Sequence, residues 1–345
     1  MPYKFARSAA GYLSLLAALS GPATGGPPLE ITRADSVDAP LRVITDVLMT
    51  GGPSRFDYQS FDPGRQRLYI SHMGAGQLVV FDVHERRIVA TLNGFPKVTG
   101  VLVVPSLNRI YASAAGAHRV MVIDGSSLRA IAEIGGISFP DGLAHAPDEA
   151  KVFVSDEAGG RDLVVDAHTN RRLGAVELGG EVGNTQYDSV GHRIWVAVQT
   201  RNQLAAIDPA TERVVGRFSL PGADHPHGLL IDAPRRLAFV ANQGNHRLLL
   251  VDLRTMRVLS EHPLGDEPDV LAIDARLRRL YVASESGEVT VFDERADRLE
   301  TLGTYRAPHA HSVAVDPGTH EVFLPLADVG GRPVLRILTP NPQGH

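Results

Sequence analysis

The sequence predicts an all-β fold, a seven-bladed β-propeller with four antiparallel strands in each blade. The first observation is a tetrad that begins with an aromatic residue and recurs seven times. Its aromatic residues are Tyr69, Tyr111, Phe153, Trp195, Phe239, Tyr281 and Phe323. Consecutive members are 42 residues apart, with one step of 44 between 195 and 239. The second observation is that short strand-like segments, and no long helical pattern, fill each period, which is typical of propellers.

Each repeat contains four segments with strand propensity. The first follows a polar residue that lies about twelve positions before the aromatic one, as in residues 227–232. The second carries the tetrad, the third is an aliphatic run such as residues 77–82, and the fourth is a run such as residues 87–92. Val, Ile and aromatic residues favour strands, and these runs have the length of blade strands.

An Asp–Arg pair marks the turn between the third and fourth strands. In six repeats an Asp is followed five residues later by an Arg: Asp82/Arg87, Asp124/Arg129, Asp166/Arg171, Asp208/Arg213, Asp252/Arg257 and Asp293/Arg298. An Asp side chain can accept hydrogen bonds from backbone amides two residues on and so begin a turn. Repetition in six blades indicates a structural rather than a catalytic role.

The seventh repeat lacks this turn and ends after its third strand, at residues 333–338. Residues 41–48 match the pattern of the missing fourth strand. We therefore predict that this N-terminal strand completes blade seven. Such closure pairs strand edges that would otherwise invite aggregation.

Length and composition are consistent with one propeller domain over residues 41–340, followed by a tail at 341–345. The chain has 345 residues, of which 43% are hydrophobic, enough for a large core. The formal net charge is -5 and the Lys and Arg residues are scattered, so we expect no nucleic-acid partner. Cysteine is absent, which excludes disulfides and a thiol nucleophile. The sequence contains neither a P-loop nor a Gly-x-Ser-x-Gly motif.

The first residues have the features of a secretory signal peptide, which we assign to residues 1–23. Lys4 and Arg7 precede an apolar run over residues 9–19, and small residues follow it. The run is too short to span a membrane comfortably, although a retained anchor is the alternative. Residues 24–40, rich in Gly, Pro, Ala and Asp, are interpreted as a flexible leader. We expect a periplasmic or secreted protein without a transmembrane span after signal removal.

One position in the repeat carries the best indication of function. It lies twelve residues before the aromatic residue, or eleven in the fourth repeat, and we expect its side chain to point toward the propeller axis. The seven residues are Asp57, Thr99, Asp141, Asn184, His227, Asp269 and His311. Seven blades would bring them into one ring, in which four consecutive members are His227, Asp269, His311 and Asp57.

These four consecutive residues are the predicted ligands of a divalent metal ion. Imidazole nitrogen together with carboxylate oxygen suits Zn²⁺, Mn²⁺ and other transition metals. Asp57, Asp141 and Asn184 alone would suit Ca²⁺ better, which makes Ca²⁺ the second choice. Asp141 and Asn184 are also candidate ligand-binding residues. The alternative interpretation is that these polar side chains only hold water at a wet axis.

A second set lies two residues before each ring position, and alternation in an extended chain would place it on the same side. It comprises Arg55, Lys97, Phe139, Val182, His225, Glu267 and His309. His225 and His309 are candidate proton carriers in catalysis, because imidazole exchanges protons near neutral pH. Glu267 is a candidate ligand-binding residue, and Arg55 and Lys97 are candidates for holding an anionic ligand.

The tetrads resemble the Tyr-Val-Thr-Asn repeat of YVTN-type seven-bladed propellers, found mostly in secreted or surface proteins of bacteria and archaea. Phe239-Val-Ala-Asn and Tyr281-Val-Ala-Ser are the closest, and the resemblance covers residues 41 to about 340. The layout is also similar to that of streptogramin lyases, of gluconolactonase- and regucalcin-type lactonases, and of the zinc-dependent lyase that finishes peptide amidation. The resemblance implies the fold, and in such enzymes polar residues near the axis bind a metal or act as acid and base.

Three functions remain open. The first is an exported binding protein that holds a divalent metal or a small polar ligand at the ring. The second is a metal-dependent hydrolase or lyase that acts on a small lactone- or ester-like substrate. The third is a non-catalytic scaffold whose outer surfaces bind a protein partner. We expect a monomer.

Overall fold

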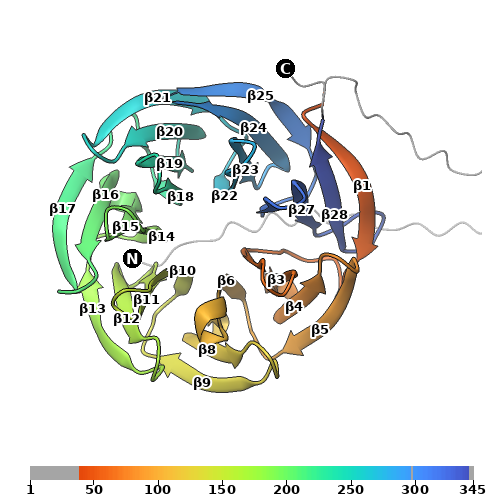
Figure 1. Cartoon of the computed structure of the whole chain (residues 1–345), viewed down its shortest axis with the longest axis horizontal. Helices are drawn as coiled ribbons and strands as arrows, with labels where there is room; N and C mark the ends of the chain where they lie inside the picture. The colour runs from red at the N-terminus through yellow and green to blue at the C-terminus, as the bar shows by residue number, and fades with distance from the viewer. Residues whose placement is uncertain (1–38, 297, 342–345) are drawn as a thin grey trace, which may run out of the picture. The chain divides into compact units, whose positions relative to one another are not determined.

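The computed structural model describes residues 39–296 and 298–341, which form a seven-bladed β-propeller (Figure 1). Within these residues, seven sheets each contain four antiparallel strands. The predicted fold class is therefore confirmed. The segments assigned to a signal peptide (1–23), to most of the leader (24–38) and to the last four tail positions (342–345) lie outside the described residues.

The first four blades follow one another in chain order. Blade one contains β2 (Gln59–Asp62), β3 (Arg67–His72), β4 (Gln77–Asp82) and β5 (Arg87–Asn93). Blade two contains β6 (Val98–Val104), β7 (Arg109–Ala114), β8 (Arg119–Asp124) and β9 (Ala130–Gly135). Blade three contains β10 (Pro140–Ala146), β11 (Lys151–Asp156), β12 (Arg161–Asp166) and β13 (Arg172–Glu177). Blade four contains β14 (Val182–Asp188), β15 (Arg193–Val198), β16 (Gln203–Asp208) and β17 (Arg213–Ser219).

The remaining blades continue around the ring. Blade five contains β18 (Pro226–Asp232), β19 (Leu237–Asn242), β20 (Arg247–Asp252) and β21 (Arg257–Pro263). Blade six contains β22 (Pro268–Asp274), β23 (Arg279–Ser284), β24 (Glu288–Arg295) and β25 (Arg298–Arg306). Blade seven contains β26 (Ala314–Asp316), β27 (Glu321–Leu326), β28 (Val334–Pro340) and β1 (Leu41–Leu48). The described loops also contain four short 3₁₀ helices: η1 (Met73–Ala75), η2 (Pro105–Leu107), η3 (Ala115–Ala117) and η4 (Gln199–Arg201).

The first described strand completes the last blade. β1 pairs antiparallel with β28, with Leu41 opposite Pro340, so that blade seven has the order β1-β28-β27-β26. Across this pair, Arg336 Nε and Nη2 donate to the two carboxylate oxygens of Asp46 at 2.8 and 2.7 Å. The predicted closure is confirmed, and a bidentate ion pair adds to its backbone hydrogen bonds.

The Asp of the turn between the third and fourth strands holds backbone amides. Asp124 Oδ1 accepts from the N–H groups of Ser126 and Ser127 at 3.1 and 2.7 Å. Asp208 Oδ1 accepts in the same way from the N–H of Thr211 at 3.0 Å. Hydrogen bonds of this kind begin a turn, which is the role that we inferred for the Asp from the repeat.

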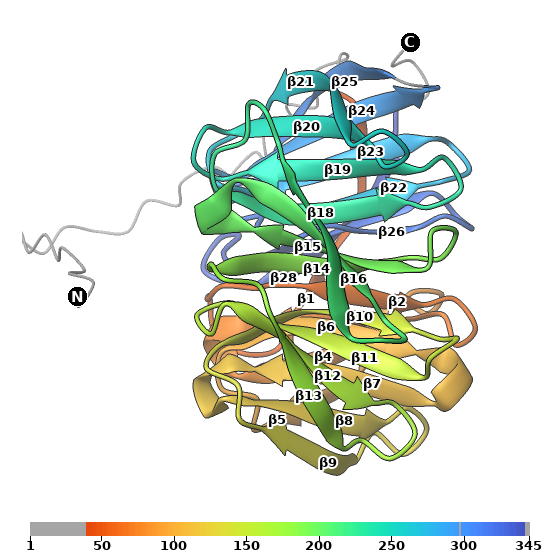
Figure 2. The same cartoon turned by 90° about the vertical axis from the view of Figure 1, so that its left-hand side faces the viewer.

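The hydrophobic core lies between neighbouring blades, where adjacent sheets face one another. The seven aromatic residues of the tetrads are all buried in it. Tyr69 of blade one, for example, shares a cluster with Val98 and Ile110 of blade two. Full burial of a large apolar side chain contributes about 1.5–3 kcal/mol. Toward the axis, the inner strand β14 contacts the inner strands of both neighbouring blades, β10 and β18 (Figure 2).

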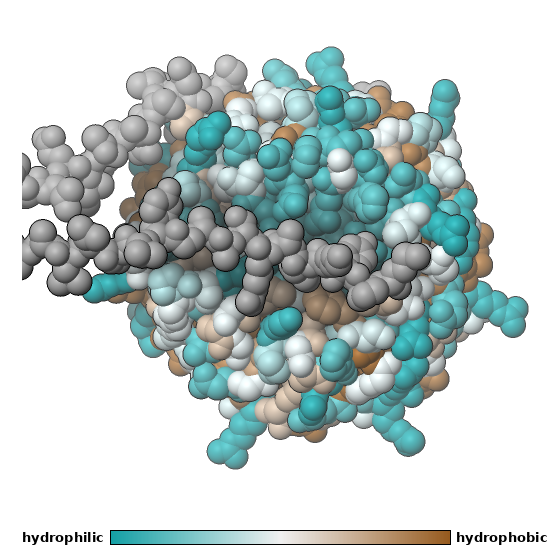
Figure 3. All heavy atoms as spheres, turned by 180° about the vertical axis from the view of Figure 1, so that it is seen from behind, coloured by the Kyte–Doolittle hydropathy of each residue, from teal (hydrophilic) through white to brown (hydrophobic). Residues whose placement is uncertain are grey.

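Among the described residues, the outer surface carries scattered apolar side chains. Ile131, Leu173, Val215 and Leu259 are exposed on the outermost strands of blades two to five. Isolated exposed side chains of this kind need no partner. Hydrophilic side chains gather around a hollow above the middle of the face shown in Figure 3. Within the described ranges, no helix is long and apolar enough to cross a membrane.

Candidate functional site

β-bulges near the start of the inner strands direct the ring side chains toward the axis. A single register shift between β18 and β19 spans His227, and a single shift between β22 and β23 spans Asp269. Equivalent shifts occur around Thr99, Asp141 and Asn184. A bulge re-aims one side chain and locally interrupts regular pairing. The bulges therefore place these residues of the predicted ring at one level.

All seven predicted ring residues are buried, and the most exposed of them, His227, is only 6% exposed. Glycines next to the ring let neighbouring blades approach closely. A Cβ on Gly228 would lie 2.0 Å from the carbonyl oxygen of Asp269, and a Cβ on Gly100 would lie 2.0 Å from that of Asp141. A side chain at either position would push two blades apart at the axis.

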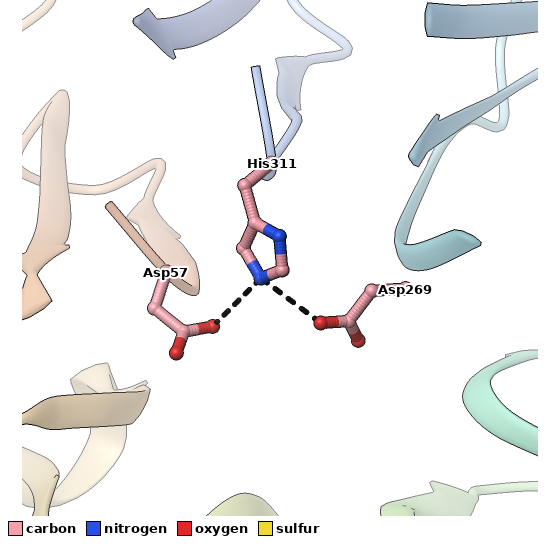
Figure 4. Close-up of side chains that lie close together, drawn as sticks. All are labelled: Asp57, Asp269 and His311. Atoms are coloured by element: carbon pink, nitrogen blue, oxygen red, sulfur yellow. Dashed lines mark ion pairs between the residues drawn. The ribbon is translucent and has the colours of Figure 1, made fainter. Parts of the chain in front are cut away.

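One group of three potential metal-ligand atoms within 4.8 Å of one another occurs among the described residues: Asp57, Asp269 and His311 (Figure 4). His311 Nε2 lies 3.0 Å from Asp269 Oδ2 and 3.5 Å from Asp57 Oδ1. The ligand atoms of a metal bound at about 2.0–2.2 Å are separated by roughly 3–3.6 Å, so these distances suit a shared cation. Asp57 Oδ1 is buried and has no hydrogen-bond partner. The donor atoms therefore fit a divalent metal.

His227 lies outside this compact group, on the other side of Asp269. Its Nε2 is 3.3 Å from Asp269 Oδ1 and 3.8 Å from Asp141 Oδ2. The four predicted metal ligands therefore do not converge on a single point as we expected. Three of them do, whereas His227 approaches the second carboxylate oxygen of Asp269.

A cavity of about 300 Å³ adjoins the ring, and its lining includes Arg55, Tyr58, Glu157, Gln243 and Glu285. The Tyr58 hydroxyl donates a hydrogen bond to Asp269 Oδ1 at 3.2 Å. Arg55 Nη1 pairs with Glu285 Oε1 at 2.9 Å, and Arg55 Nη2 lies 2.9 Å from His311 Nε2. The positively charged Arg55 side chain thus lies among carboxylates, at a position where a cation is electrostatically favoured.

The ionisable groups of the ring perturb one another strongly. Burial disfavours the imidazolium of His227, but Asp269 and Asp141 outweigh burial and raise the pKa of His227 to about 10. Burial is likewise outweighed at His311, where Asp269 and Asp57 raise the pKa to about 10. Burial raises the pKa of Asp141 well above its usual value. The pKa of Asp269 is well below its usual value, because the two imidazoles outweigh burial. The positive charge of the protonated imidazoles therefore balances the negative charge of the carboxylates. A bound cation would supply that positive charge instead.

Four residues of the second predicted set do not face the ring. Lys97, His225, Glu267 and His309 are exposed, and their backbone φ values of 49°, 49°, 52° and 67° are left-handed. The expected alternation requires extended backbone, and the chain is not extended where it turns into the inner strand. This placement gives no support to a proton-carrier role for His225 and His309. Arg55 is the member of the set that reaches a ring side chain.

Three residues at the site were not predicted: Tyr58, Glu157 and Glu285. The repeat does contain a signal for two of them. The position four residues after the tetrad aromatic lines the cavity in several blades, where it is occupied by Met73, Glu157, Gln243 and Glu285. Tyr58 directly follows a ring residue in blade one, and nothing periodic marks it.

Comparisons with known proteins support the fold only. No family model matches the sequence, and no curated protein matches it. Among solved structures, the chain is similar to Kuenenia stuttgartiensis hydrazine synthase, with a TM-score of 0.71 and 16% sequence identity. The alignment covers 84% of this chain and 97% of that chain. A likeness at this identity shows a shared propeller fold and carries no argument about activity. The YVTN-type resemblance stays a prediction.

Proposed function

We propose that this propeller binds a divalent metal ion at Asp57, Asp269 and His311, and a small polar ligand in the adjoining cavity. The observation that carries the proposal is the compact buried group itself, in which His311 Nε2 lies 3.0 and 3.5 Å from two carboxylate oxygens. Buried charges are normally paired or coordinate a metal. Asp57 Oδ1 accepts no hydrogen bond and has only the ion pair of 3.5 Å with His311, which indicates that its present pairing is incomplete.

The donor set favours a transition metal. Two carboxylate oxygens and one imidazole nitrogen suit Zn²⁺ or Mn²⁺, and Ca²⁺ is the second choice because imidazole is a poor ligand for it. Three protein ligands leave coordination positions free for water or for a ligand in the cavity of about 300 Å³. The proposed ligand is therefore small and polar.

Elemental analysis tests the proposal. The protein is purified without chelator, and a second sample is dialysed against Zn²⁺ or Mn²⁺ and then against buffer. We expect bound metal in the wild type and a loss of the ion at this group in folded His311→Ala and Asp57→Asn variants. His84→Ala is the matched control, because the His84 side chain is 81% exposed in a turn. Absence of metal from the wild type under all these conditions would contradict the proposal.

The alternative function is a metal-dependent hydrolase or lyase that acts on a small lactone- or ester-like substrate. The observation that favours it is the cavity beside the metal-ligand group, which has the volume of a small-molecule site. A metal bound there would act as a Lewis acid or lower the pKa of a bound water. Arg55 would orient an anionic group of the substrate. A screen of lactones and esters tests this function, and turnover should disappear in His311→Ala while the variant remains folded.

We further propose that the protein works as a monomer in the periplasm or outside the cell. The support for export is the signal-like sequence at residues 1–23. Fractionation of expressing cells, with mass spectrometry of the N-terminus, tests export and cleavage. Light scattering tests the oligomeric state. Full-length protein in the cytoplasmic fraction would contradict export.

A further inference from the structure

We propose that the ring holds a second divalent cation at His227, Asp141 and Glu157, and that Asp269 bridges the two ions. This inference rests on the proposed function, because the first ion would bind the other oxygen of the same carboxylate. The ring would then be a dinuclear centre.

The carboxylate of Asp269 faces an imidazole on each side. Its Oδ2 lies 3.0 Å from His311 Nε2, and its Oδ1 lies 3.3 Å from His227 Nε2. Each imidazole therefore has its own oxygen. A carboxylate that offers one oxygen to each of two ions is a natural bridge for the separation of about 3.5–4 Å typical of two-metal sites.

The second half of the ring offers the same chemical types of donor as the first, at wider spacing. In the first half, His311 Nε2 lies 3.5 Å from Asp57 Oδ1, and its other ring nitrogen, Nδ1, lies 3.5 Å from Glu285 Oε1 at the mouth. In the second half, His227 Nε2 lies 3.8 Å from Asp141 Oδ2, and Glu157 lines the adjoining cavity. Gln199 Nε2 donates to Glu157 Oε1 at 3.2 Å and so holds that carboxylate at the mouth.

A buried carboxylate oxygen that accepts no hydrogen bond marks each half. Asp141 Oδ2 has no hydrogen-bond partner although Asp141 is only 4% exposed, and Asp57 Oδ1 is its counterpart in the first half. A buried acceptor without a partner is costly, and a cation would satisfy it.

The number of ions bound per chain tests the inference. The full chain is equilibrated with Mn²⁺, freed of unbound ion by dialysis, and analysed for manganese, and the experiment is repeated with Zn²⁺. We expect two ions in the wild type, one in His227→Ala, one in His311→Ala, and a loss of both in Asp269→Asn. His84→Ala should keep two. Electron paramagnetic resonance of the Mn²⁺ protein should show an exchange-coupled pair in the wild type and an isolated ion in His227→Ala.

Circular dichroism and thermal unfolding establish that each variant is folded, and His227→Gln replaces His227→Ala if alanine prevents folding. One ion in the wild type that His227→Ala retains would overturn the second site and leave the proposed function intact. One ion that either histidine variant loses would show a single site shared by both imidazoles, and would also overturn the inference. No bound ion in the wild type would overturn both proposals.

Discussion

Asp269 Oδ2 lies 3.0 Å from the Nε2 of His311, although the two residues belong to different blades. The other oxygen of Asp269 lies 3.3 Å from His227, and the Tyr58 hydroxyl donates to that oxygen as well. One carboxylate therefore joins blades five, six and seven to blade one at the axis. Its pKa well below the usual value follows from these contacts, which outweigh its burial.

Loss of the Asp269 charge should destabilise the protein without any metal. In Asp269→Asn, two buried imidazolium groups would lose their shared counter-ion, and removal of one partner of a buried pair costs about 3–5 kcal/mol. Urea unfolding in the presence of chelator, at pH 7, measures the change in the free energy of unfolding. Asp266→Asn is the control, because the Asp266 side chain is 79% exposed. Equal stability of the two variants would show that Asp269 does not balance the imidazoles.

Removal of the Arg55 charge should tighten cation binding. Asp57 and Glu285 raise the pKa of Arg55 despite its burial, so that its guanidinium stays charged beside the proposed ions. In Arg55→Gln we expect the affinity for Mn²⁺ to rise roughly tenfold, or about 1.4 kcal/mol. Isothermal titration calorimetry measures the change, and Arg254→Gln, whose side chain is 59% exposed, controls for net charge. Weaker binding in Arg55→Gln would indicate that Arg55 supports the cation site instead of competing with the cation.

Asp162 should make the stability of the fold depend on pH. Burial, opposed by the hydroxyl of Thr185 and supported by the charge of Asp156, raises the pKa of Asp162 from 3.8 to about 7. Between these values the folded state holds a proton that the unfolded state releases, so the free energy of unfolding falls as pH rises through this window. Asp162→Asn keeps an acceptor for Thr185 and removes the titration. Relative to the wild type, we expect the variant to gain at least about 1 kcal/mol of stability between pH 5 and pH 8.

Urea unfolding at pH 5 and pH 8 measures this difference for the wild type, for Asp162→Asn and for the exposed control Asp266→Asn. The control should follow the wild type at both pH values. An identical pH dependence in all three proteins would show that Asp162 ionises in the fold as readily as in the unfolded chain.

A methyl group at Gly228 should disturb the ring although it removes no ligand. The Cβ of Gly228→Ala would lie 2.0 Å from the carbonyl oxygen of Asp269, so the inner strands of blades five and six would have to separate. We expect a loss of about 1–3 kcal/mol in the free energy of unfolding and weaker Mn²⁺ binding. Gly135→Ala is the matched control, because a Cβ at Gly135 meets nothing within 4 Å. If both variants behave like the wild type, the axis tolerates wider blade spacing than its geometry indicates.

The fold could be predicted because the repeat encodes it locally. The tetrad aromatics recur in each blade and the turn aspartates in six of them, and neighbouring segments of the chain pair to form each sheet. Closure by residues 41–48 was predictable for the same reason, since one strand was missing from blade seven and one strand was left over.

The site could be predicted only in part. The ring position was found because the strand geometry fixes its distance from the tetrad aromatic. His225 and Glu267 were misplaced, because the left-handed backbone at those positions leaves no clear mark in a single sequence. The failure of His227 to join the group of Asp57, Asp269 and His311 also escaped prediction, since it depends on the width of the ring and on side-chain rotamers.

The pairing of β1 with β28 has a consequence for biosynthesis. Asp46 and Arg336, which meet across this pair, are 290 residues apart in the chain. Blades one to six can form as the nascent chain emerges, whereas β1 must wait, unpaired, until almost all of the chain has been made. Contacts of such sequence separation slow folding, and an unpaired strand edge is prone to aggregation. A stalled or truncated chain should therefore depend on chaperones far more than the finished protein does.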